Sequence, residues 1–91
     1  MESYSILSEL VDLAETLGMT VRRAPSGDGS SAHPGGAIVK LKGREMLFLD
    51  PSAPVADQID VVALALRGRP EIENRFLAPE LRAAIDQAGR D

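Results

Sequence analysis

His33, Ser30, Ser31 and Asp28 supply the residue types of a nucleophilic triad, in which a base removes the proton of a hydroxyl and a carboxylate orients the base. All lie within residues 24–36, a stretch rich in glycine, proline and serine without a large apolar side chain to anchor it. We expect a flexible loop there, whereas catalysis needs a nucleophile held rigidly beside its base. The pattern therefore favours a solvent-exposed loop over a catalytic site.

Asp50, Asp57 and Asp60 surround the expected start of a helix, and a hard cation accepts carboxylate oxygens as ligands. Their spacing matches no regular metal-binding pattern. Asp50 precedes a proline, as turn residues commonly do, and Asp57 near a helix N-terminus interacts favourably with the helix dipole. The glycines of residues 24–36 also lack the Lys-Ser/Thr ending of a phosphate-binding loop. We therefore expect no metal and no cofactor.

The composition excludes further classes of function. The 91 residues suffice for one domain, residues 1–91, and no more. Because the chain has no cysteine, a disulfide, a thiolate metal site and a cysteine nucleophile are excluded. Its single histidine leaves almost nothing from which to build a metal site or an imidazole base. A net charge of −4 and an aromatic content of 3% argue against nucleic acid as a partner.

Two observations bear on the compartment. The N-terminal residues lack the basic and apolar regions of a signal peptide, so we expect a cytoplasmic protein. The longest unbroken apolar run, residues 61–66, is far shorter than the roughly 20 residues that span a bilayer. We therefore expect no membrane partner.

Helical periodicity identifies the first elements that must position these residues. Apolar side chains recur at helical spacing over residues 5–17, and a second helix over residues 54–67 is apolar nearly all round its second half. We expect this second helix to be central and buried, so that Leu64→Ala costs about 2–5 kcal/mol. Pro79 opens a last helix, which ends at Gly89.

Strand-forming residues predict β-structure at residues 19–23 and a hairpin of residues 37–41 and 44–50. Residues 71–77 are expected to be extended or partly strand-like. The predicted fold class is therefore α+β. It has a small, mostly antiparallel sheet, made of one strand plus a β-hairpin, packed with about three helices in the order α-β-β-β-α-(β)-α.

A two-residue tip at Lys42 and Gly43 determines the register of the hairpin, because Gly43 can adopt the positive φ of a tight turn. The predicted pairs are Leu41–Arg44, Lys40–Glu45, Val39–Met46, Ile38–Leu47 and Ala37–Phe48. One face then carries Val39, Met46 and Phe48, and the other carries Ile38, Leu47 and Leu49. Since both faces are apolar, each must be covered by helices of the chain or by a partner.

Basic residues gather around the first strand and the hairpin tip, at Arg22, Arg23, Lys40, Lys42 and Arg44. A patch of this kind steers an acidic partner, such as the acidic first helix of another copy, although a charged hairpin tip also serves solubility alone. The candidate interaction residues are Val39, Lys40, Lys42, Arg44, Met46 and Phe48.

Two resemblances extend this interpretation. The segments GREMLFLDP (43–51) and QIDVVALAL (58–66) resemble the strand and helix of ImmA/IrrE-type zinc metallopeptidases. The zinc and general-base positions of that family fall on Leu64, Ala65 and Gly68, so the HExxH motif is absent and the resemblance implies a metal-free relative. The segments LGMTVR (17–22), GGAIVKLKGR (35–44) and FLAPELR (76–82) resemble small bacterial proteins of unknown function, over most of the chain.

These observations favour a non-catalytic protein that acts through protein association or self-association, such as a homodimer. The alternative is a small-ligand-binding or hydrolase-like domain that uses Asp50, Asp57, Arg44 or His33 in a shared pocket.

Overall fold

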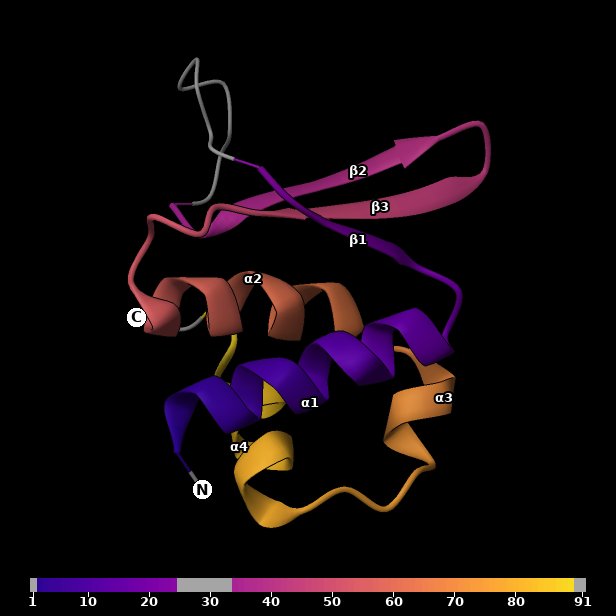
Figure 1. Ribbon diagram of the computed structural model, residues 1–91. Helices are drawn as coiled ribbons and strands as arrows, with labels where there is room; N and C mark the ends of the chain where they lie inside the picture. Colours follow the sequence, from indigo (N-terminus) through magenta and orange to yellow (C-terminus); the bar gives the residue numbers. More distant parts are fainter. Residues whose placement is uncertain (1, 25–33, 90–91) are drawn as a thin grey trace.

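The protein consists of a sheet laid across a layer of helices, seen in a computed structural model that describes residues 2–24 and 34–89 (Figure 1). The elements are α1 (Ser3–Thr16), β1 (Thr20–Arg23), β2 (Gly36–Leu41), β3 (Arg44–Leu49), α2 (Val55–Leu66), α3 (Pro70–Glu73) and α4 (Pro79–Gln87). The α+β class is thus confirmed. The triad candidates Asp28, Ser30, Ser31 and His33, and most of the predicted loop at residues 24–36, lie outside the described residues.

The sheet is mixed rather than mostly antiparallel. Its strand order is β1-β3-β2, in which β3 pairs antiparallel with β2 and parallel with β1. The parallel pair joins segments far apart in the chain, so no turn signal in the sequence marks it. Arg23 of β1 and Gly36 of β2 both align with Leu49, so the last residue of β1 and the first residue of β2 lie at the same end of the sheet.

The hairpin has the predicted register throughout, from Leu41–Arg44 at the tip to Ala37–Phe48. Gly43 has a φ of 79°, and Lys42 also has a positive φ, of 52°. Positive φ at both central residues is the geometry of a type I′ turn, whose twist matches that of the flanking strands.

One face of the sheet packs on α1 and α2, which lie side by side beneath it (Figure 1). Leu47 and Leu49 of β3 are fully buried on this face, as are Leu10 of α1 and Leu66 of α2. The apolar spacing of both helices is explained by this contact, because each presents one stripe to the sheet or to the other helix. In the described residues, no helix is long and apolar enough to cross a membrane.

The prediction that α2 is buried is confirmed for its second half, residues 61–66, except at Leu64, which is only half-buried. The start of α2 is held by Gln58, a buried residue whose Nε2 donates a hydrogen bond to the carbonyl of Ala53 over 3.0 Å. Gly35, just before β2, packs on this first turn so closely that an added Cβ would lie 2.1 Å from the carbonyl oxygen of Asp57.

Residues 71–77, expected to be extended or partly strand-like, instead begin with the short helix α3. Pro70 occupies its first turn, where a proline pre-sets φ and its missing N–H costs nothing. Fully buried Ile72 anchors this turn to the core. The final helix α4 begins at Pro79 as predicted and buries Leu81 and Ile85.

Candidate functional site

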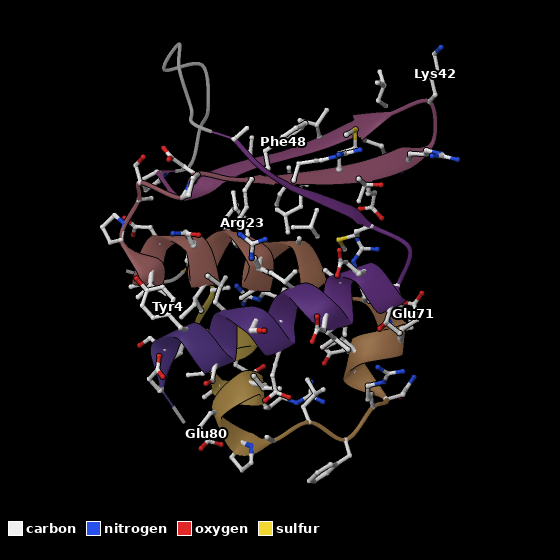
Figure 2. All side chains as sticks on the ribbon, viewed as in Figure 1. Tyr4, Arg23, Lys42, Phe48, Glu71 and Glu80 are labelled. Atoms are coloured by element: carbon white, nitrogen blue, oxygen red, sulfur yellow. The ribbon has the colours of Figure 1, made fainter. Side chains whose placement is uncertain are left out.

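The sheet has a second face, directed away from the helices, which we call the outer face. Since side chains alternate along a strand, Met46 and Phe48 point opposite to buried Leu47 and Leu49. Figure 2 shows Phe48 on the side of the sheet away from α1 and α2. The register adds the remaining strand residues of this face, so the outer face consists of Thr20, Arg22, Ala37, Val39, Leu41, Arg44, Met46 and Phe48.

The centre of the outer face is apolar and accessible. Val39 is 38% exposed and Leu41 is 56% exposed, and Met46 and Phe48 are partly exposed. In the part of the chain that the structure describes, no helix covers this face. A soluble monomer rarely leaves a contiguous apolar surface of this kind open, and such patches commonly mark interaction sites.

The charge at the margins of the outer face has one sign. Arg22 lies beside Phe48 in the register, and Arg44 follows the hairpin tip. None of the strand residues that form the outer face carries a carboxylate. Asp50 follows the end of β3, and its Oδ1 accepts a hydrogen bond from the Ser52 N–H over 2.9 Å, so it forms part of a turn. The outer face therefore attracts negative charge around an apolar centre.

The structure divides the predicted interaction residues among three places. Val39, Arg44, Met46 and Phe48 share the outer face. Lys40 pairs with Glu45 on the opposite face, and Lys42 projects from the hairpin tip (Figure 2).

Four members of the outer face are missing from the predicted interaction residues: Thr20, Arg22, Ala37 and Leu41. Leu41 is missing although its alternation with Val39 and Ala37 in the predicted register was a sufficient signal. Arg22 was part of the basic patch but was not named as an interaction residue. Only the long-range pairing of β1 with β3 places it on the same face as Met46 and Phe48.

On the helix side of the sheet, the Glu45 carboxylate forms a hydrogen-bonded ion pair with Arg69. Arg69 is in turn held by its Nε, which donates to the carbonyl of Ala65 over 2.7 Å. The hydrogen bond from Arg69 lowers the pKa of Glu45, with smaller contributions from the charges of Arg69 and Lys40, while partial burial opposes the shift. This ion pair ties the hairpin to the chain just after α2.

The residues proposed for a ligand-binding or hydrolytic alternative are spread over the molecule. Arg44 and Asp50 stand at opposite ends of β3, about 20 Å apart at the rise of an extended strand. Asp57 lies in the first turn of α2, and His33 is outside the described residues. Among the described residues, no group of three His, Asp or Glu side chains is placed to hold a metal ion.

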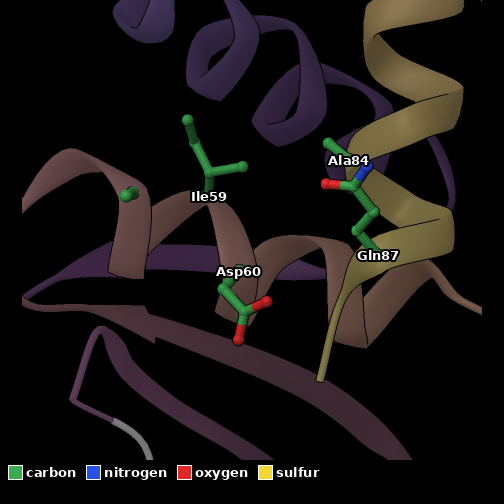
Figure 3. A pocket seen from close by; sticks show the side chains of 5 residues that line it. Ile59, Asp60, Ala84 and Gln87 are labelled. Atoms are coloured by element: carbon green, nitrogen blue, oxygen red, sulfur yellow. The ribbon is translucent and has the colours of Figure 1, made fainter. Parts of the chain in front are cut away.

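An open hollow of about 300 Å³ lies between α2 and α4 (Figure 3). It is lined by Ala56, Ile59, Asp60, Ala84 and Gln87. The Asp60 carboxylate accepts a hydrogen bond from the Gly89 N–H over 3.1 Å, so this group helps to hold the end of the chain after α4. Asp60, the one acidic residue that lines the hollow, thus has a structural role.

No protein-family model matches the chain, and no curated protein or solved structure is significantly similar to it. The resemblances to ImmA/IrrE-type metallopeptidases and to small bacterial proteins of unknown function therefore stay predictions.

Proposed function

We propose that the chain is a small cytoplasmic, non-catalytic protein-association domain, and that its outer face binds an apolar segment of another protein with carboxylates at its margins. The observation that carries this proposal is the exposed apolar centre of Val39, Leu41, Met46 and Phe48. Burying such side chains contributes about 25 cal/mol per Å² of apolar surface, so covering this face supplies binding energy.

The arginines of the outer face favour an acidic partner over a second copy of the chain. If the outer faces of two copies packed on each other, each copy would bring Arg22 and Arg44 to the contact with no carboxylate from the outer-face strand residues to pair them. Like charges in a contact disfavour that association. A partner with carboxylates around its apolar segment would instead bind faster and in a defined orientation. Nucleic acid is disfavoured, because the outer face offers Phe48 alone as a stacking side chain and the chain carries a net charge of −4.

The test uses two synthetic helical peptides with the same stripe of leucines, one with glutamates and one with lysines at all other positions. We expect the acidic peptide to shift the amide NMR signals of Val39, Met46 and Phe48, and added salt to weaken its binding. The lysine peptide should leave these signals in place. Equal binding of both peptides, or shifts confined to the helix side, would contradict the proposal.

Matched variants sharpen this test. Val39→Ser removes an apolar side chain from the outer face, and Phe76→Ser removes a more exposed one from the link between α3 and α4. The proposal requires that Val39→Ser weakens binding of the acidic peptide about tenfold and that Phe76→Ser leaves it unchanged. An oligonucleotide that shifts the same outer-face signals as strongly as the acidic peptide would instead indicate a general polyanion site.

A further inference from the structure

We infer that β2 is a self-association edge, at which a second copy of this chain pairs antiparallel to form a continuous six-stranded sheet. In the strand order β1-β3-β2, the described residues place no strand beyond β2. This inference does not depend on the proposed function, because it concerns the edge of the sheet and not its outer face.

The backbone of β2 has groups directed to this edge. In a two-residue hairpin the residues that flank the turn form a hydrogen-bonded pair, and bonding then alternates along the strand. Leu41, Val39 and Ala37 therefore bond to β3, in agreement with the Asp50 N–H donating to the Gly35 carbonyl over 2.9 Å in the same phase. The N–H and C=O of Ile38 consequently point away from β3, toward the edge.

The side chains along β2 also favour pairing. Ile38 is 46% exposed on the helix side, and Val39 and Leu41 are exposed on the outer face. Natural sheets protect their edges with prolines, bulges and charges, yet β2 contains no proline and only Lys40 as a charged residue. An edge that is apolar on both faces gains from a neighbouring strand on both.

A second copy fits this edge in a specific register. A two-fold axis through Ile38 pairs Ile38 with Ile38 of the second copy, and Ala37 with Val39 of the second copy. Residues that oppose each other then lie on the same face, as a continuous sheet requires. Lys40 meets the small Gly36 of the second copy, so no like charges are opposed.

The other edge of the sheet does not suit self-pairing. β1 has only four residues, Thr20–Arg23, and two of them are arginines. Antiparallel pairing of β1 with itself would concentrate four arginines in a short ladder, and like charges across strands are destabilising. The arginines of β1 therefore leave β2 as the edge that suits self-association.

The test exploits the two-fold axis at Ile38. We expect sedimentation equilibrium to show a dimer for the wild-type chain, and about a 100-fold weaker dimer for Ile38→Lys and for Ile38→Glu, because each variant opposes like charges at the axis. A 1:1 mixture of the two variants should restore the dimer as a heterodimer. Hydrogen exchange should show the Ile38 amide protected in the wild-type dimer.

Three outcomes would overturn the inference: a wild-type chain that is monomeric at about 1 mM, a dimer that survives both substitutions, or variants that fail to associate when mixed. The far-ultraviolet circular dichroism of each variant establishes that it is folded. Binding of the acidic peptide by monomeric Ile38→Lys, with shifts at Phe48, separates this inference from the proposed function, since either can fail while the other holds.

Discussion

Arg69 forms a hydrogen-bonded ion pair with Glu45, and this pair joins the chain just after α2 to the second residue of β3. The pair lies on the helix side of the sheet, because Glu45 is in phase with buried Leu47. The ion pair holds the hairpin from the helix side and leaves the outer face of the sheet uncovered.

The ion pair predicts a pH-dependent contribution to stability. The pKa of Glu45 is lowered from its ordinary value of 4.5, chiefly by the hydrogen bond from Arg69. The stabilisation is therefore fully present above that ordinary value and is lost as the pH falls through the lower folded-state pKa. Because both side chains are partly exposed, Glu45→Gln should reduce the free energy of unfolding by at most about 1 kcal/mol at pH 7.

Urea unfolding of the wild type and of Glu45→Gln from pH 7 down to pH 3 tests this expectation. The difference between their free energies of unfolding should shrink at the acid end. Glu9→Gln, on the exposed side of α1, is the control for net charge and should match the wild type. A difference that grows with falling pH would refute the assigned role.

Neighbouring leucines of α2 should differ in their sensitivity to truncation. Leu66 is 0% exposed and Leu64 is half-buried. Leu66→Ala should lower the free energy of unfolding by about 2–5 kcal/mol, whereas Leu64→Ala should cost less than about 2 kcal/mol. Denaturant unfolding of both variants measures the two values, and equal losses would mean that α2 is rotated about its axis.

Gly35 should not tolerate a side chain. A Cβ there would meet the backbone carbonyl of Asp57 at 2.1 Å, and a backbone atom cannot move aside as a side chain does. We expect Gly35→Ala to lower the free energy of unfolding by about 1–3 kcal/mol. Gly43→Asn, at the open hairpin tip, is the comparison, since asparagine tolerates a positive φ and nothing lies near an added Cβ. Thermal unfolding that ranks these variants in the opposite order would be evidence against the close packing of β2 on α2.

Hydrogen bonds from Arg82 should hold the link between α3 and α4 in place. Its Nη2 donates to the carbonyls of Ile72 over 3.0 Å and Arg75 over 2.7 Å, and its Nη1 donates to Glu73 over 3.3 Å. Arg82→Lys cannot reproduce this fork and should cost about 1–3 kcal/mol in the free energy of unfolding. Amide exchange at Arg75 should accelerate in the variant.

Phe76, in the same link, provides the contrasting case. It is 91% exposed, so Phe76→Ser should change the free energy of unfolding by less than about 0.5 kcal/mol. A larger loss in denaturant unfolding would mean that Phe76 packs against the protein in solution.

The local parts of the fold were predictable from short-range patterns. The hairpin register followed from one glycine at the tip and the alternation on either side, and α1, α2 and α4 followed from periodicity bounded by proline or glycine. The segment at residues 71–77 was ambiguous because Ile72, Phe76 and Leu77 are its only large apolar residues, and buried Ile72 with Pro70 decides for a helical turn.

The sequence alone determined the α+β class, the hairpin and the position of its tip, because these depend on contacts between residues close in the chain. Tertiary structure alone decided which hairpin face is covered, since both faces are apolar and alternation cannot distinguish them. It also decided that β1 joins β3 in parallel and that Arg22 therefore lies beside Phe48. Those relationships arise when α1 and α2 bury the helix side of the sheet, which includes Leu47. This packing forms cooperatively between distant segments, so no local sequence pattern predicts it.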